Sequence, residues 1–209
     1  MAASDAAHAK IIAQRFSLLR TRLLHEMRSR GWSRLAVVPV TADAGGTFVA
    51  VNLALALARQ PHTQVTLIDL DLGKPGVAAQ LGIPGSAAIS PALREGGDLD
   101  ALVVRVNEAP NLAVLAPEGA EPAAAEILQD ETLQQALERL HARQPAEIVI
   151  FDTAALLLED AALAALPLAD ALLLVADGRN GTAANMAEAE RLLAGMPPVM
   201  GVVLNKSDD

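Results

Sequence analysis

Short apolar runs alternate with amphipathic segments along most of the chain. Six runs have the length of a buried strand, and they lie at residues 34–40, 64–69, 112–116, 147–152, 171–176 and 199–204. Between them, apolar residues recur at three- and four-residue intervals, which is the spacing of an amphipathic helix. This spacing predicts helices at 6–30, 47–59, 123–143, 160–166 and 182–194, with Asp130 capping a second piece of 123–143. The Gly- and Pro-rich stretch 70–108 predicts only short helices and loops.

The strand runs are apolar throughout rather than alternating with polar residues. A strand of this kind is covered on both faces, which is typical of a parallel sheet between two layers of helices. We therefore predict an α/β fold, a doubly wound and mainly parallel sheet flanked by helices, with an N-terminal amphipathic helix. A single domain is expected, in which residues 1–33 form a helix packed on or flanking the α/β part at 34–209.

Composition argues against several classes of function. The 209 residues carry 16 Lys and Arg against 25 Asp and Glu, for a net charge of −9, and include three Phe and one Trp. An acidic chain with so few aromatic side chains lacks both the charge and the stacking surface for nucleic acid. The chain has no cysteine, which excludes disulfides, thiolate metal sites and cysteine nucleophiles. No stretch has the pattern of a signal peptide or a membrane span, so a cytoplasmic protein is expected.

Carboxylates gather at the ends of two predicted strands. Asp69 and Asp71 follow the second strand, and Asp152 ends the fourth. Ligands of doubly wound folds bind at the carboxyl ends of the strands, so these side chains are expected to lie together as ligands. An isolated aspartate in such a place more often caps a turn or a helix, and this alternative applies to Asp69 and Asp152.

The loop after the first strand opens a helix with Gly45-Gly46-Thr47. In a P-loop, backbone N–H groups surround phosphates, a lysine reaches the outer phosphates, and the next residue supplies a hydroxyl to Mg²⁺. Thr47 provides that hydroxyl, although it could equally be the N-cap of the helix. The lysine position is Gly46.

Four motifs in this order resemble those of a known family. They are VTADAGGTFVAVNLA at 40–54, LIDLDLGKP at 67–75, IVIFDTAA at 148–155 and VVLNK at 202–206. Together they resemble the cytoplasmic domain of bacterial tyrosine kinases, MinD/ParA-like P-loop proteins that work with polysaccharide co-polymerases in capsule and exopolysaccharide export. The resemblance runs from residue 14 to residue 206.

The resemblance implies a role for several positions of this chain. It implies nucleotide contacts at Gly45, Gly46, Thr47 and Asn205. It implies Mg²⁺ ligands at Thr47, Asp69 and Asp152, and an inherited acidic position at Asp71.

The chain departs from the family in its catalytic features. The P-loop lysine is replaced by Gly46, the paired prolines after the second acidic strand are Ala154 and Ala155, and the tyrosine-rich tail has no counterpart, since the 209 residues contain no tyrosine. We therefore expect no tyrosine autophosphorylation, and no functional catalytic residue at the three aspartates.

The family's ring-closing Glu-x-x-Arg-x-x-Arg motif is also altered. Its positions hold Gln14, Ser17 and Arg20 in this chain. The charged pair between carboxylate and guanidinium cannot form from Gln14 and Ser17. A homo-oligomer is possible, but the family's ring is not expected.

Loss of the lysine leaves the carboxylates uncompensated. A lost charge-assisted contact to an anion costs about 1.5–3 kcal/mol, or about ten- to a hundredfold in affinity. Lys74 is the sole lysine near the acidic motif, and its Lys-Pro context also suits a solvent-facing turn. We expect no tightly bound cofactor, and Mg-ATP or Mg-ADP only at weak affinity.

Two functions follow from these observations. The first is a pseudokinase that regulates exopolysaccharide or capsule synthesis and export by contact with a membrane-bound, Wzz-like co-polymerase, which would recruit it to the inner face of the cytoplasmic membrane. The alternative is a MinD/ParA-like ATP-dependent switch with residual ATPase activity. The arginines of the N-terminal helix suit a solvated or partner-binding face better than a lipid-binding one, because lipid-binding helices carry several aromatic residues and this one has only Phe16.

Overall fold

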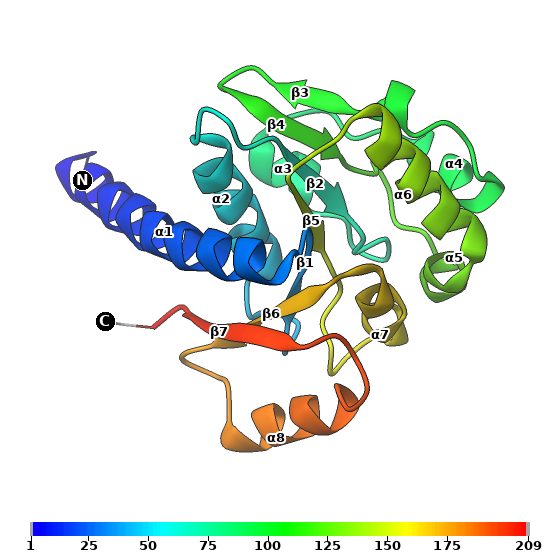
Figure 1. Ribbon diagram of the computed structural model, residues 1–209. Helices are drawn as coiled ribbons and strands as arrows, with labels where there is room; N and C mark the ends of the chain where they lie inside the picture. Colours follow the sequence, from blue (N-terminus) through cyan, green and yellow to red (C-terminus); the bar gives the residue numbers. More distant parts are fainter. Residues whose placement is uncertain (1, 208–209) are drawn as a thin grey trace.

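A single sheet lies between two layers of helices in this protein (Figure 1). The structure is a computed structural model that describes the backbone of residues 2–207 and the side chains of residues 10–207. Within that part of the chain the strand order is β3-β4-β2-β5-β1-β6-β7. The strands are β1 Arg34–Pro39, β2 Val65–Asp69, β3 Val104–Val106, β4 Ala109–Leu115, β5 Ile148–Asp152, β6 Ala171–Asp177 and β7 Val199–Asn205.

The helices divide between the two faces of the sheet. They are α1 Ala2–Arg30, α2 Gly46–Ala58, α3 Val77–Leu81, α4 Ile89–Glu95, α5 Ala124–Gln129, α6 Glu131–Arg143, α7 Asp160–Ala165 and α8 Ala183–Leu192, with short 3₁₀ helices at Asp100–Leu102 and Leu166–Leu168. Apolar side chains of α1, α2 and α3 share one core with the sheet, and those of α4 to α8 share the other. The predicted fold class is confirmed. The Asp130 side chain caps α6 by accepting from the Thr132 N–H, as predicted.

The apolar strand runs reflect burial on both faces. Every residue of β2, β5 and β6 is buried, and β1 lies between β5 and β6 in parallel. Two elements differ from the expectation. Residues 104–106, in the stretch expected to hold no strand, pair antiparallel with β4. The apolar strand β7 stands at the edge of the sheet and is only half-buried.

The topology brings distant segments together at one end of the sheet. Asp69 and Asp152 end neighbouring parallel strands and are paired in register. The loop that follows β1 opens at the same end, because β1 is the other parallel neighbour of β5. The carboxyl ends of β1, β2 and β5 therefore surround one site.

Helix α1 packs on α2 through one face. Phe16, Leu23 and Met27 are buried in the core beneath it, and the Phe16 ring meets that of Phe48 edge-on at 6.0 Å. The structure does not describe residues 1 and 208–209, which are the outer ends of the predicted helix at 1–33 and of the predicted α/β part at 34–209. Within the described chain, no helix combines the length and apolar character needed to cross a bilayer.

The Asp170 carboxylate links the start of β6 to the start of β1 through hydrogen bonds. Asp170 accepts hydrogen bonds from the backbone N–H groups of Ser33 and Arg34, each at 2.8 Å. Removing it leaves two N–H groups without an acceptor.

Asp170→Ala is therefore expected to lower the free energy of unfolding by about 1 kcal/mol or more, because two partly buried N–H donors lose their acceptor. Urea denaturation measures the change. Asp98→Ala serves as the control, because Asp98 and Arg143 form an exposed ion pair in which both side chains are 55% accessible, and such pairs contribute little. If Asp170→Ala and Asp98→Ala lowered the free energy of unfolding equally, the structural role assigned to Asp170 would be contradicted.

Candidate functional site

The loop between β1 and α2 has the backbone shape of an anion-binding turn. The Ala44 N–H donates to the Thr41 carbonyl at 3.0 Å, and Gly45 adopts a left-handed conformation with φ of +85° as the N-cap of α2. The first N–H groups of a helix have no partner within it, and they favour an anion. Gly45, and not Thr47, holds the cap position, so the N-cap interpretation of Thr47 is wrong.

Gly46 packs directly on the end of β1. A Cβ atom at this position would lie 2.7 Å from Cγ, 2.9 Å from Cδ and 3.1 Å from Cβ of Pro39. Distances below 3.0 Å do not occur for real Cβ atoms, and a proline ring cannot rotate away. The close approach therefore requires glycine at position 46 for as long as Pro39 is present.

Asp152 is the most deeply buried charge of the site. It is fully buried, and within the described residues neither of its carboxylate oxygens has a hydrogen-bond partner. Burial raises its pKa well above the usual value, and the neighbouring Asp69 and Asp71 raise it further, while the Thr47 side chain lowers it in part. Asp152 thus has the environment of a protonated acid or of a cation ligand, but not of a helix cap.

Asp69 is already engaged by the backbone. Its Oδ2 accepts from the N–H groups of Gly76 at 2.9 Å and Val77 at 3.0 Å, and its Oδ1 accepts from the Asp71 N–H at 3.2 Å. The structure therefore shows the capping role for Asp69, at the start of α3. Burial nevertheless raises its pKa to about 7, since three hydrogen bonds only partly offset desolvation.

Asp71 lies at the mouth of the site. Burial raises its pKa to about 6, and the charge of Glu159 raises it as well. Its Oδ1 accepts from the Lys74 N–H at 3.1 Å. The Lys74 side chain is exposed, and its charge lowers the pKa of Asp71 only as the smallest of the causes. Lys74 therefore sits beside Asp71 and not beside Asp152.

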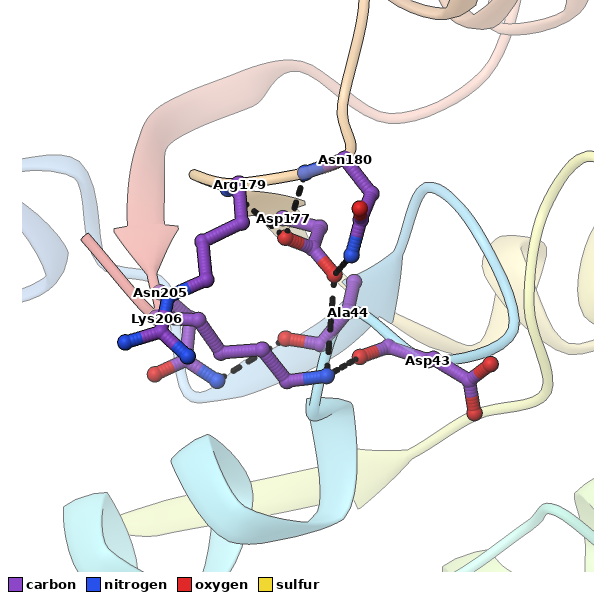
Figure 2. A network of polar contacts seen from close by, with 7 residues as sticks. All are labelled: Asp43, Ala44, Asp177, Arg179, Asn180, Asn205 and Lys206. Atoms are coloured by element: carbon purple, nitrogen blue, oxygen red, sulfur yellow. Dashed lines mark hydrogen bonds and ion pairs between the residues drawn. The ribbon is translucent and has the colours of Figure 1, made fainter.

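Residues at the end of β7 hold the loop from the side (Figure 2). The Asn205 amide donates to the Ala44 carbonyl at 2.8 Å and touches Gly45 so closely that a Cβ there would collide with it. The Lys206 ammonium donates to the Asp43 carbonyl and lies 3.6 Å from Asp177 Oδ2. Two loop carbonyls are thus fixed by side chains of one edge strand and the residue after it.

Lys206 was not among the site residues expected from the sequence. It has a φ of +59°, the sole positive value at a non-glycine residue in the described chain. Such strain persists only where surrounding contacts fix it. The sequence points to Lys206 only as a lysine directly after the last predicted strand. It does not reveal that this lysine contacts Asp43, which lies 163 positions away.

Arg20 and Ser17, at the altered assembly motif, make contacts within the chain. The Ser17 hydroxyl donates to the Ala13 carbonyl at 2.8 Å, and the Arg20 guanidinium donates to the Ala56 carbonyl at 3.3 Å. Gln14 is exposed on α1. The structure brings none of these three side chains to the loop or the carboxylates.

The side chains available at this site determine whether it can hold Mg²⁺ and a nucleotide. Among the described residues, no three Asp, Glu, His or Cys side chains are grouped to hold a metal ion. Asp69 has both oxygens engaged by N–H groups, so the remaining candidate ligands are Asp152 and the neighbouring Thr47 hydroxyl, which acts on the Asp152 carboxylate. Within residues 10–207, no lysine or arginine lowers the pKa of Asp69 or Asp152, and Lys74 acts only on Asp71.

The raised carboxylate pKa values predict a pH dependence of stability. Because Asp69 and Asp152 titrate at higher pH when folded than when unfolded, the folded state binds more protons between about pH 4 and 7, and the free energy of unfolding falls as pH rises through that range. Asp152→Asn should raise the free energy of unfolding at pH 8, where the buried carboxylate is costly, and raise it by less at pH 5. Denaturant titrations at the two pH values test this.

Asp177→Asn is the matched control with the opposite sign. N–H groups of Asn180 and Arg179 lower the pKa of Asp177 to about 2, so its charged form contributes stability that is complete above the unfolded pKa of about 3.9 and is lost as pH falls through about 2. This variant should be destabilised at pH 8. A loss of stability in Asp152→Asn at pH 8 would contradict an unpaired carboxylate.

Comparison with known proteins shows which chains this one is similar to. No family model matches the chain. The succinoglycan biosynthesis transport protein ExoP of Rhizobium meliloti (strain 1021) is 30% identical over 188 residues, an alignment that covers 83% of this chain and 22% of ExoP. The chain thus spans about a fifth of the length of that relative.

Solved structures share the whole fold. The VpsO kinase domain has a TM-score of 0.81 at 22% identity, covering 98% of each chain. The kinase domain of the Escherichia coli tyrosine kinase ETK has a TM-score of 0.79 at 26% identity, covering 90% of this chain and 72% of that one. The Pyrococcus furiosus cell division ATPase MinD has a TM-score of 0.68 at 19% identity, covering 84% and 74%. The chain is thus similar in sequence to ExoP and to the ETK tyrosine kinase domain, and it shares the P-loop fold of these kinase domains and of MinD.

Proposed function

We propose that this protein is a pseudokinase of the bacterial tyrosine kinase group, one that regulates export of an exopolysaccharide by protein contact rather than by phosphoryl transfer. The contact of Gly46 with Pro39 carries the proposal. A side chain at position 46 would meet the Pro39 ring, which supports a loop that functions without the lysine. Phosphoryl transfer depends on cations arranged around the moving group, and this loop supplies none.

The carboxylates support the same conclusion. A triphosphate would approach Asp152, Asp69 and Asp71 without a positive side chain between them, and Asp69 is occupied as a cap. Mg²⁺ bound by Thr47 and Asp152 would supply charge neutralisation, but with too few protein donors for tight binding. The chain also contains no tyrosine to accept a phosphoryl group. We infer weak or no binding of Mg-ATP and Mg-ADP.

The name of ExoP, a succinoglycan biosynthesis transport protein, supports a role in polysaccharide export. The proposed partner is a membrane-bound co-polymerase of the Wzz-like type, which would hold this domain at the inner face of the cytoplasmic membrane. The altered positions Gln14 and Ser17 speak against assembly through the family's ring contact.

A double substitution tests the central claim. Pro39→Gly with Gly46→Lys removes the ring and restores the lysine, and it should gain affinity for Mg-ADP by about ten- to a hundredfold, the value of a charge-assisted contact. Calorimetric titration measures affinity, and thermal unfolding should show a stabilisation of about 2.7 kcal/mol at a hundred times the dissociation constant.

The single variants serve as controls. Pro39→Gly alone should gain nothing, and Gly46→Lys alone should be destabilised by the clash. Tight binding of Mg-ADP by the unmodified protein would refute the inferred loss of nucleotide binding.

The alternative function is a MinD/ParA-like switch with residual ATPase activity. The observation in its favour is the pair of Asp152 and the Thr47 side chain beside the free end of α2. The two functions differ in what nucleotide-site substitutions do in the cell.

In a strain lacking the protein, expression of Asp152→Asn or Thr47→Ala should restore polysaccharide export fully if contact is what matters. Polymer yield and chain length are the readouts, with immunoblotting to show equal protein levels. The switch would be established if neither variant restored polysaccharide export at equal protein levels and if ATP hydrolysis depended on Asp152.

A further inference from the structure

The two edges of the sheet differ in how well they are protected against pairing with another strand. At one edge, β3 is three residues long, has a bulge after Arg105 and exposes that arginine at its centre. Short length, a bulge and a charge are features by which proteins block an open sheet edge. At the other edge, β7 is seven residues long and contains neither a charged residue nor a proline. Strand β7 is therefore the unprotected edge of this sheet (Figure 1).

The backbone groups of β7 point alternately towards β6 and away from it. The Asn205 carbonyl accepts from the Gly178 N–H at 2.7 Å, so the N–H and C=O groups of Asn205 face β6. Both groups of one residue point to the same side of a strand, and the side alternates along it. Those of Val203 therefore also face β6, whereas those of Val202 and Leu204 face outwards. Within the part of the chain that the structure describes, β6 is the sole strand that pairs with β7.

The two residues with outward backbone groups also expose apolar side chains. Val202 and Leu204 are 52% and 60% exposed, and they lie on one face of β7 because they are two residues apart. This face is turned towards α8, since Leu204 and Met186 line one small cavity. Val203, between them, packs in the core on the opposite face. Unpaired backbone groups and apolar side chains thus occur together, a combination that favours the addition of a strand.

The regular part of β7 is symmetric about one residue. The register between β6 and β7 shifts just before Gly201, and Lys206 follows the strand with a left-handed φ of +59°. The regular segment is therefore 201–205, and Val203 lies at its centre. This segment contains no charge, so another copy of it can approach without burying an ion.

We propose that β7 is the contact between two copies of this chain, which join their sheets edge to edge about a two-fold axis. An antiparallel pair with the axis at Val203 places Val202 of each copy opposite Leu204 of the other. Because the backbone groups of both residues face outwards, each of these pairs exchanges both of its hydrogen bonds. The facing valine and leucine side chains pack as cross-strand pairs on the α8 face. The segment is complementary to itself, which is what a two-fold contact requires.

The contact is small, so the dimer is expected to be weak and to depend on concentration. Interfaces that bury less than about 1,200 Å² are typical of transient complexes. The net charge of −9 on each copy also opposes association at low salt. Association should therefore strengthen as salt rises from about 50 to about 500 mM, because salt screens this repulsion. A contact held by ion pairs would weaken instead.

Sedimentation equilibrium of the full chain tests the proposal, and hydrogen exchange shows whether strands pair. The mass should rise from that of one chain towards that of two as the protein concentration increases into the high-micromolar range. The N–H groups of Val202 and Leu204 should exchange fast at low concentration and slowly at high concentration. The Val203 N–H faces β6, so it should exchange slowly at both concentrations.

Substitutions in β7 separate pairing between copies from the fold of one copy. Val202→Lys adds a charge opposite Leu204, and Val202→Pro removes an outward N–H, so each should weaken association by at least about tenfold. Neither removes a hydrogen bond to β6, so both variants should melt close to the unmodified protein. Val203→Pro removes an N–H that faces β6 and should lower the melting temperature instead.

Leu158→Lys is the matched control, because Leu158 is 65% exposed in the loop after β5, away from the sheet edge. It should associate as the unmodified protein does. A mass of one chain at every concentration would overturn the proposal, as would equal weakening by Val202→Lys and Leu158→Lys. A dimer in which the Val202 and Leu204 N–H groups still exchange fast would also overturn it, because the copies would then meet at another surface.

Discussion

The close approach of α2 to the end of β1 governs the site. Gly46 lies against the Pro39 ring, and this contact sets where the helix begins and how the loop before it turns. Because β1 is sandwiched between β5 and β6, its end cannot shift to make room without disturbing the centre of the sheet. The loop therefore combines a left-handed Gly45 at the N-terminus of α2 with a position 46 that has no room for a side chain.

The same constraint explains the unusual electrostatics. Without a cation in the loop, Asp152 remains a buried acid whose oxygens have no hydrogen-bond partner among the described residues, and the nearby carboxylates raise its pKa further. Such a group costs stability when charged. Asp69 differs from it, because its carboxylate accepts N–H bonds at the start of α3.

Much of the fold could be predicted from the sequence, because strands buried on both faces appear as uninterrupted apolar runs. That signal does not distinguish an edge strand, so the exposure of β7 was not foreseen. It also missed β3, three residues long with an exposed Arg105 at its centre. The aspartates of the site were placed correctly at strand ends, since parallel topology brings those ends together.

Contacts across the fold were beyond such reasoning. The close contact between Pro39 and Gly46 depends on the angle between β1 and α2. That angle cannot be read from the residue types. The capping role of Asp69 depends on how the chain returns at residues 76–77. Gly46 and Asp69 could be singled out from the sequence, but their contacts came from the packing of other elements.

The anchoring of the loop by Asn205 and Lys206 has a mechanical consequence. Both residues sit at the end of β7, which has a neighbour on one side only and exposes Val202 and Leu204. A strand held on one side is the easiest in a sheet to displace. The shape of the loop between β1 and α2 is therefore fixed by residues at the edge of the sheet. A molecule that binds and displaces β7 would also move this loop without contacting it.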